Sequence, residues 1–219
     1  MFEQQKKKTE LMIVCDDKTM QYANYLIQLI GQNDDNGESA VGIKDGTVSA
    51  AIYTEKQYKD TLARITSNTH ILFMGNNKST KEQAKFLDCQ IDCFGMKYGW
   101  LGKRAVMFVD ESVKKDEYND FVDYAKKFQL EYKKKDEKKK AKPGIGAVAG
   151  AAGAVGAAKV ALPAVAVGVG AWLLTPIVEV AGIYGIVKSS KAKKDVKEQQ
   201  YRCLTLAVYM DGLQKFLEE

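Results

Sequence analysis

The chain has 219 residues, enough for one medium-sized domain and an additional segment. Its net charge is only +5, and much of the excess lysine lies on either side of one nearly uncharged stretch, which favours anionic lipid over nucleic acid as a partner. Four scattered cysteines exclude a disulfide framework. Because the only histidine, His70, lies far along the chain from Cys89 and Cys93, we expect no metal site and no cofactor.

Short apolar runs alternate with stretches of helical periodicity through the first 132 residues. The predicted strands are residues 11–15, 48–53, 70–74, 89–94 and 105–109. The predicted helices are residues 19–30, 54–65, 80–87 and 116–132. This order predicts an α/β fold, with a mostly parallel five-stranded sheet and flanking helices.

The connection between the fourth and fifth predicted strands is unusual. Residues 95–104 are too few for the helical crossover that joins parallel strands. These two strands therefore either form an antiparallel hairpin or are joined by a tight, irregular loop. The element order as a whole resembles that of flavodoxin-like and TIR-like domains, and the resemblance is one of layout.

Ligands of open α/β sheets bind beyond the carboxyl ends of the strands, and three predicted loops lie there. The first follows residues 11–15, the second follows 70–74, and the third is 95–104. A nucleotide-like ligand would suit the third loop, because its cations attract phosphate and its aromatic rings offer stacking faces. The candidate ligand-binding residues are Asp16, Asp17, Asn76, Asn77, Lys78, Lys97, Tyr98, Trp100, Lys103 and Arg104.

Each of the three loops also has a purely structural interpretation. Asp16 or Asp17 can cap the helix that follows, and Ser79 or Thr80 can cap the next one. The third loop can be a glycine-rich hairpin in which Trp100 covers the sheet edge. The sequence contains no convincing Ser/His/Asp, Cys/His or paired-carboxylate arrangement, so it leans away from an enzyme.

Residues 144–187 carry only two charges, Lys159 and Glu179, and are long enough for two bilayer crossings of about 20 residues each. Lysine runs lie on both sides of this stretch, within residues 133–142 and 188–194. Since positive charge tends to stay on the cytoplasmic side, we expect a hairpin that enters and leaves the membrane on the same side. A glycine- and alanine-rich helical hairpin buried against another protein is the alternative.

The first arm of this hairpin has the pattern of a glycine zipper. Four glycines recur at spacings of four and three, namely Gly146, Gly150, Gly153 and Gly156. Small residues at this period create a face on which another helix packs closely, so we expect self-association. Lys159 and Glu179 are costly inside a bilayer unless they pair or meet water, and we assign them to the same oligomer face.

The predicted organisation has four parts. They are a cytosolic α/β domain (residues 1–132), a lysine-rich linker (133–143), the membrane hairpin (144–187), and a basic segment with an amphipathic helix (188–219). The apolar positions from Val196 to Phe216 indicate that this last helix returns to pack on the α/β domain. Both termini then lie on the cytoplasmic side of the membrane.

These patterns predict a membrane-associated effector or channel-like, pore-forming protein, whose α/β domain senses a ligand and whose hairpins assemble in the bilayer. The architecture resembles that of bacterial effectors that couple a sensing domain to membrane disruption. The expected partners are copies of the same chain, anionic lipid, and a nucleotide-like ligand or a partner protein. Two alternatives remain. One is a membrane-tethered, TIR-like enzyme that cleaves a nucleotide with Asp16, Asp17 or Glu82 as its acid, and the other is a non-catalytic membrane scaffold.

Overall fold

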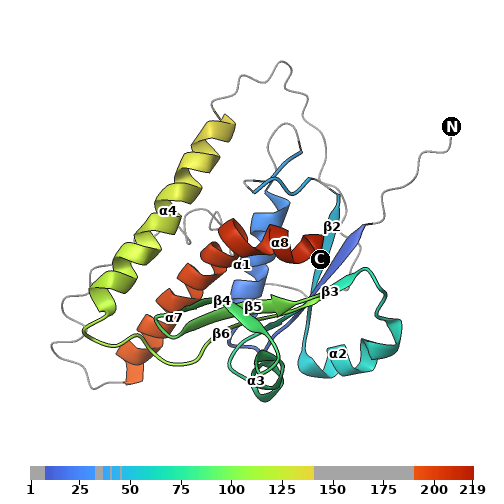
Figure 1. The fold of residues 1–219 in the computed structure, drawn as a ribbon, viewed down its shortest axis with the longest axis horizontal. Helices are drawn as coiled ribbons and strands as arrows, with labels where there is room; N and C mark the ends of the chain where they lie inside the picture. The colour runs from blue at the N-terminus through green and yellow to red at the C-terminus, as the bar shows by residue number, and fades with distance from the viewer. Residues whose placement is uncertain (1–7, 33–36, 40, 45, 141–189) are drawn as a thin grey trace.

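The computed structural model describes residues 8–32, 37–39, 41–44, 46–140 and 190–219. These residues form a six-stranded sheet with helices on both faces (Figure 1). The mixed α/β fold predicted from the sequence is thereby confirmed. The predicted membrane hairpin, residues 144–187, lies outside the described residues.

The sheet has the strand order β2-β1-β3-β6-β5-β4. The strands are β1 (Thr9–Val14), β2 (Val48–Tyr53), β3 (Thr69–Met74), β4 (Asp88–Cys93), β5 (Met96–Leu101) and β6 (Arg104–Val109). The neighbours from β2 to β6 pair in parallel, whereas β6, β5 and β4 form an antiparallel meander. The parallel part is the portion that α/β crossovers build, and the meander extends one edge of it.

The predicted number of five strands is wrong by one, because most of residues 95–104 form the strand β5. Two-residue turns join β5 to its neighbours. Phe94-Gly95 links β4 to β5, because Cys93 pairs with Met96, and Gly102-Lys103 links β5 to β6, because Leu101 pairs with Arg104. Phe94 and Gly95 both have positive φ, 51° and 67°, which matches the twist of a tight hairpin. Two of the three glycines that suggested a loop, Gly95 and Gly102, therefore lie in the turns on either side of β5, and Gly99 lies within the strand.

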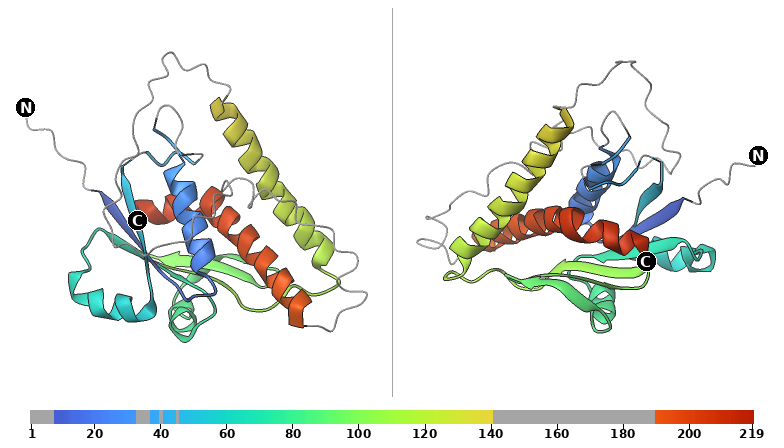
Figure 2. Two further views of the ribbon diagram at one scale, coloured as in Figure 1. Left: turned by 180° about the vertical axis from the view of Figure 1, so that it is seen from behind. Right: turned by 45° about the horizontal axis from the view of Figure 1, so that its top comes forward.

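Helices cover the two faces of the sheet unequally (Figure 2). One face carries α1 (Met20–Gly31), α4 (Tyr118–Lys140), α7 (Ser190–Ala207), the π-helical segment η2 (Val208–Gly212) and α8 (Leu213–Glu218). The other face carries α2 (Glu55–Thr61), the short 3-10 helix η1 (Leu62–Arg64) and α3 (Lys78–Ala84). The larger core lies on the first face, where α1, α4 and α7–α8 pack on the sheet, and the smaller core lies under α2 and α3.

The C-terminal helices belong to the core of the α/β domain. Leu204, Val208, Leu213 and Phe216 are each fully buried in the same cluster as the strands. The segment from Val196 to Phe216 thus packs on the sheet in the structure. The helix begins earlier than expected, at Ser190, because the lysines and the alanine of residues 190–195 are good helix formers.

Helix α4 also exceeds its predicted bounds. It continues from the expected end at residue 132 to Lys140, so most of the predicted linker 133–143 is helical. Lysine and glutamate run through this part of the sequence and support helix without needing a buried face.

Helices α4 and α7 lie side by side and run in the same direction. Near the start of α4 the Tyr118 hydroxyl donates to Gln199 Oε1 at 2.9 Å, and further along the Tyr132 ring lies 6.4 Å from that of Tyr209. With a rise of 1.5 Å per residue, Lys140 and Ser190 then lie about 45 Å apart along the layer. The chain therefore leaves the domain at one end of this layer and re-enters at the other (Figure 1).

No helix within the described ranges is both long enough and apolar enough to cross a bilayer.

Candidate functional site

The order of the strands reverses at β1, and this places a topological switch point between the carboxyl ends of β1 and β3. The helix after β1 packs on one face of the sheet and the helix after β3 packs on the other. In doubly wound α/β folds, ligands bind at such a switch point. We therefore take this edge, together with the neighbouring end of β6, as the candidate site.

Asp16, at the end of β1, holds the first turn before α1. Its Oδ1 accepts hydrogen bonds from the backbone N of Thr19 at 2.9 Å and from the Thr19 hydroxyl at 2.8 Å. Thr19 itself is buried, whereas the neighbouring Asp17 is exposed. Asp16 therefore stabilises the turn that precedes α1, whose N-cap residue, Thr19, makes no side-chain capping bond, and Asp17 is the acidic side chain of this pair that faces solvent.

Gly75 brings the end of β3 against this turn. Its φ is +106°, and a Cβ at this position would lie 3.0 Å from Thr19 Oγ1 and 3.1 Å from Asp16 Oδ2. The two loops of the switch point are therefore in close contact at their base. Glycine is required here both by the backbone angle and by the approach of the Asp16 carboxylate.

The two asparagines after Gly75 fasten the loop at both ends. Asn76 Nδ2 donates to the carbonyl oxygens of Val109 at 3.0 Å and Asp110 at 3.2 Å, which ties β3 to the end of β6. Asn77 Oδ1 accepts from the backbone N of Thr80 at 2.9 Å and caps α3. One of the N–H groups that an anion would need at this helix start is thus already bonded.

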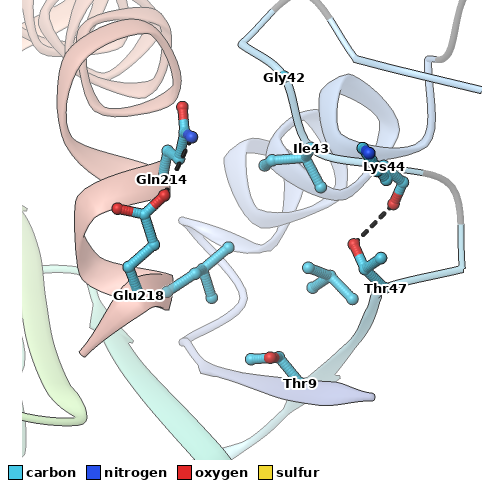
Figure 3. A pocket seen from close by; sticks show the side chains of 9 residues that line it. Thr9, Gly42, Ile43, Lys44, Thr47, Gln214 and Glu218 are labelled. Carbon is cyan, nitrogen blue, oxygen red and sulfur yellow. Dashed lines mark hydrogen bonds between the residues drawn. The ribbon is translucent and has the colours of Figure 1, made fainter. Parts of the chain in front are cut away.

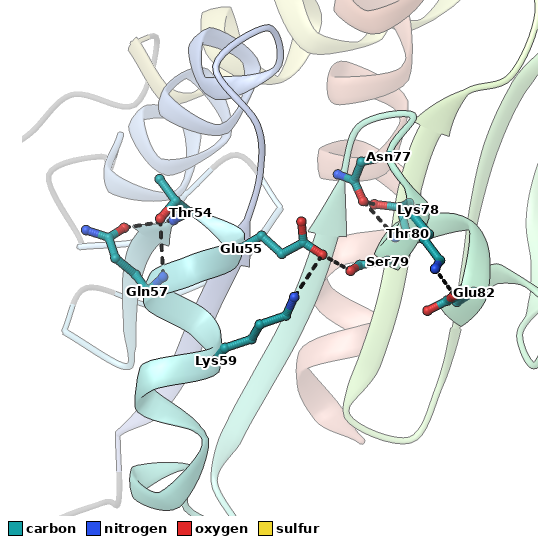
Figure 4. Close-up of polar contacts among 9 residues, drawn as sticks. All are labelled: Thr54, Glu55, Gln57, Lys59, Asn77, Lys78, Ser79, Thr80 and Glu82. Atoms are coloured by element: carbon teal, nitrogen blue, oxygen red, sulfur yellow. Dashed lines mark hydrogen bonds and ion pairs between the residues drawn. The ribbon is translucent and has the colours of Figure 1, made fainter.

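The residues that follow Asn77 connect α3 to α2 (Figure 4). Ser79 donates to Glu55 Oε1, and this carboxylate also lies 3.7 Å from Lys59 Nζ. Lys78 pairs with Glu82 at 3.8 Å on the exposed side of α3. This network joins the two helices of the smaller layer and leaves Lys78 directed along its own helix.

The cations of the third predicted loop are placed far from one another. Lys97 forms a 2.8 Å ion pair with Asp92 across the β4–β5 hairpin, near the carboxyl edge. Lys103 and Arg104 lie at the opposite edge, where Lys103 Nζ donates to the backbone oxygen of Ser67. Lys97 pairs with Phe108, and Arg104 pairs with Leu101, so four residues of strand, about 13 Å, separate the two positions. The structure therefore does not bring these three cations together in one site.

The two aromatic residues of that loop lie on β5. Tyr98 is fully buried, and its ring is packed against Gly212 of the π-helical segment, where a Cβ would lie 2.5 Å from Tyr98 Cε1. Trp100 is half-buried, with its ring 5.6 Å from that of Tyr98. Tyr98 therefore serves the core and offers no free face for stacking.

Sequence reasoning missed the contribution of α7 to the candidate edge. The Tyr201 hydroxyl accepts a hydrogen bond from the backbone N of Val109 at 3.3 Å, and its ring stacks on Tyr22 at 4.9 Å. Lys197 Nζ donates to the carbonyl oxygen of Asp110 at 3.3 Å. The amphipathic pattern of this helix predicted its packing, but it carried no signal for which of its residues meet the end of β6.

Asp110 and Gln200 complete this edge. Lys81 Nζ lies 3.9 Å from Asp110 Oδ1, so a cation of α3 and the Asp110 side chain meet there. Gln200 is fully buried, and its Nε2 donates to the carbonyl oxygens of Phe94 and Glu111. One side chain of α7 thus holds both the β4–β5 turn and the segment after β6.

The buried groups at this edge are not ionised near neutral pH. Burial raises the pKa of the Cys15 thiol to about 12, and the carboxylates of Asp16 and Asp17 add to the effect. Burial likewise raises the pKa of Tyr201 to about 12, against the hydrogen bond from Val109, which lowers it. Cys15 is therefore an inert, protonated thiol rather than a nucleophile.

A small cavity lies at the opposite, amino-terminal edge of the parallel strands (Figure 3). It has a volume of about 240 Å³ and lies between α8, the start of β1 and the segment that precedes β2. Its lining includes Thr9, Ile43, Lys44, Gln214 and Glu218. None of the ligand-binding residues predicted from the sequence lines it.

Comparisons with protein-family models, with curated proteins and with solved structures gave no match for this chain. Among the described residues, no group of three or more His, Cys, Asp or Glu side chains is arranged to hold a metal ion. The candidate site thus rests on the geometry of the sheet edge and the residues that it gathers.

Proposed function

We propose that this protein is a membrane-associated effector, in which the α/β domain senses a ligand or partner and controls the assembly of residues 144–187 in a bilayer. One observation supports this most directly. The apolar segment is inserted between α4 and α7, which pack side by side in one layer of the domain. A tail appended to a finished domain would not be connected to the core in this way.

The connection from the candidate site to this segment is short. Lys197, Gln200 and Tyr201 meet the end of β6, and they lie seven to eleven residues after Ser190 on one continuous helix. That corresponds to about 10–17 Å along α7. A ligand that moves the end of β6 would therefore displace the helix through which the apolar segment re-enters the domain.

The assembly half of the proposal rests on the sequence. Gly146, Gly150, Gly153 and Gly156 would let one arm pack closely against another copy, and anionic lipid would meet the flanking lysines. Lys159 and Glu179 would pair or meet water in the oligomer. In this proposal both termini remain on the cytoplasmic side.

The enzymatic alternative has less support from the contacts of its candidate acids. Asp16 accepts two hydrogen bonds from Thr19, and Glu82 pairs with Lys78 on the exposed side of α3. Asp17 is exposed, at the edge of the sheet. These three carboxylates therefore do not converge on one point.

Dye release from vesicles tests the proposal. Purified full-length protein should release a trapped dye, and Gly150→Leu with Gly153→Leu should abolish release, because two leucines fill the close-packed face. Ala151→Leu with Ala154→Leu makes a change of similar size at the same spacing and should retain most of the release. If the wild-type protein releases no dye, or if the two double variants behave alike, the assembly proposal fails.

A further inference from the structure

Helix α4 continues well beyond its last contact with the core. Tyr132 is buried; its ring lies near that of Tyr209, and its hydroxyl donates to Gln32 Oε1 at 2.7 Å. Lys133, Lys134 and Lys135, which follow, are all exposed. In Figure 1 this end of α4 extends past the neighbouring helices. Helix α4 therefore continues past its last buried residue, Tyr132, into a lysine-rich stretch.

One side of α4 combines lysines with an exposed leucine. We call it the Leu130 face, and its members are Lys126, Lys127, Leu130, Lys133 and Lys134. They recur at the spacing of three and four residues that places side chains on one side of a helix. Leu130 is 56% exposed, and it is one of four large apolar side chains among the described residues that are exposed.

By spacing along the helix, the Leu130 face also includes two acids, Asp123 and Glu137, so its four lysines leave it a net positive charge. Lys126 has a 3.8 Å contact with Asp123, both well exposed, which screening by water makes weak. Lys127 Nζ lies 5.9 Å from the Phe128 ring centroid. The face thus presents at least three lysines around one leucine to solvent.

We infer that the Leu130 face binds the surface of an anionic bilayer. Each lysine near such a surface strengthens binding about fivefold, and an apolar side chain among lysines is typical of helices that lie at the lipid interface. The inference rests on the proposed membrane function and names the element that contacts the lipid. Lys133 lies about 10 Å along the helix from Lys140, and Lys140 is only a few residues before the apolar segment. The contact between the Leu130 face and lipid therefore forms next to the point of insertion.

Nucleic acid is the other polyanion that such a face would attract. Lysine alone does not discriminate between the two, but an exposed leucine gains nothing against a phosphate backbone and gains from burial among acyl chains. The uncharged stretch that begins at Gly144 also points to lipid. The face is therefore assigned to lipid, and nucleic acid becomes an outcome of the test.

The test uses full-length protein and flotation with vesicles. Lys127→Glu, Lys133→Glu and Lys134→Glu form the test variant. Lys56→Glu, Lys85→Glu and Lys215→Glu form a control with the same change in net charge at exposed sites in α2, directly after α3, and in α8. At about 0.1 M salt, wild type and control should prefer vesicles with about 30% phosphatidylserine over pure phosphatidylcholine. The test variant should bind the anionic vesicles more weakly by about a hundredfold.

Three results would overturn the inference. They are equal affinity of the test variant and the control for anionic vesicles, no preference of the wild type for anionic over neutral vesicles, and tighter binding of the wild type to duplex DNA or RNA than to anionic vesicles. Leu130→Ser keeps every charge and should weaken vesicle binding severalfold. Unchanged urea unfolding of each variant shows that its fold is intact.

Dye release separates this inference from the proposed function. Gly150→Leu with Gly153→Leu should lose release and keep the preference for anionic vesicles, because the Leu130 face is untouched. If wild type releases no dye yet the lysine variant still loses vesicle binding, the proposed function fails and the lipid-binding face stands. If the lysine variant binds vesicles like the control while wild type releases dye, the inference fails and the proposed function stands.

Discussion

Gly95 lies where three distant parts of the chain meet. It forms the β4–β5 turn with Phe94, its carbonyl accepts from the backbone N of Asp110 at 2.8 Å, and Gln200 of α7 bonds to the carbonyls of Phe94 and Glu111 around it. A Cβ on Gly95 would lie 2.2 Å from the Glu111 carbonyl oxygen. This single position therefore couples the antiparallel meander to the C-terminal helix.

We expect Gly95→Ala to lower the free energy of unfolding by about 3 kcal/mol, because the side chain meets both an unfavourable φ and a backbone oxygen. Gly102→Ala is the matched control. Its φ is also positive, +51°, but nothing lies within 4 Å of the added Cβ, so its cost should be only about 1 kcal/mol. Urea unfolding measures the free energy of unfolding of both variants. Equal losses would show that the backbone near Glu111 moves away from the added Cβ without a further loss of stability.

His70 gives the fold a dependence on pH. It is buried, with its ring 5.1 Å from that of Phe216 in α8. Burial is the main cause that lowers the His70 pKa, and the charge of Lys103 lowers this pKa further. The Asn68 backbone and the charge of Glu219 raise it. A folded-state pKa below the unfolded value of about 6.5 means that the neutral ring favours the folded state. The stabilisation is therefore present above about pH 6.5 and is lost as the pH falls.

The free energy of unfolding should decline between about pH 7.5 and about pH 5.5, with a slope of at most about 1.4 kcal/mol per pH unit. His70→Leu should flatten this part of the profile, since the chain has one histidine and carboxylates titrate mainly at lower pH. Urea unfolding at several pH values measures the slope. The same slope in wild type and variant would assign the effect to other groups.

At the scale of elements, the π-helical segment η2 is fitted to β5. Gly212 ends this segment and accepts the ring of Tyr98, and a side chain at residue 212 would overlap that ring. Within the described part of the chain, the Tyr98 hydroxyl is buried with no hydrogen-bond partner. A buried hydroxyl of this kind opposes folding, because it gives up water and gains no bond.

Tyr98→Phe should therefore raise the free energy of unfolding by about 1 kcal/mol. Tyr118→Phe provides the contrast, since the Tyr118 hydroxyl donates to Gln199 at 2.9 Å and its removal should cost about 1 kcal/mol. If Tyr98→Phe loses as much stability as Tyr118→Phe, the Tyr98 hydroxyl makes a hydrogen bond in the folded protein.

Elements with strong local signals were predictable from the sequence. The apolar runs of β1, β3 and β6 correspond to strands buried on both faces, and Thr54 caps α2 as its position suggested. Strand β5 was missed, because Gly99 and the flanking Gly95 and Gly102 resemble a loop when read alone. Its identity as a strand depends on pairing with β4 and β6, which local composition does not encode.

The candidate edge was predictable in position but not in its full set of residues. The order of elements placed the loops after β1 and β3 at one edge, where Asp16 and Asn76 lie. Lys103 and Arg104 were assigned to the same loop as Lys97 because they are close in sequence, and an intervening strand carries them to the other edge. The part supplied by α7 is about 90 residues away from the end of β6, and only tertiary packing determines its register.

For the molecule as a whole, the parallel packing of α4 and α7 constrains how residues 141–189 connect. Their flanking residues, Lys140 and Ser190, lie about 45 Å apart. Two helices packed as a close hairpin are only 8–10 Å apart between axes. In the proposed function, the chain would therefore have to turn away from the layer of α4 and α7 near Lys140 or Ser190 for the two arms of the hairpin to pack closely.

Replacement of residues 141–189 by linkers of different length tests this separation. A flexible Gly/Ser linker of about 40 residues should leave the unfolding midpoint in urea unchanged, because it spans the gap without strain. A linker of about six residues reaches only about 20–25 Å and should expose the end of α4 or the start of α7 to faster amide hydrogen exchange. Equal exchange in the two variants would mean that the two ends lie close together.

The most direct test of the central claim is fractionation of the native protein, with sizing in mild detergent beside the variant that carries the 40-residue linker. The proposed function predicts that the full-length protein is found in the membrane fraction as a large oligomer. It predicts that the linker variant is a small species with the same α/β fold, bound to membranes only through the Leu130 face and released from them by high salt. A full-length protein that is soluble and small without detergent would contradict the claim and would assign residues 144–187 to the interior of a soluble protein.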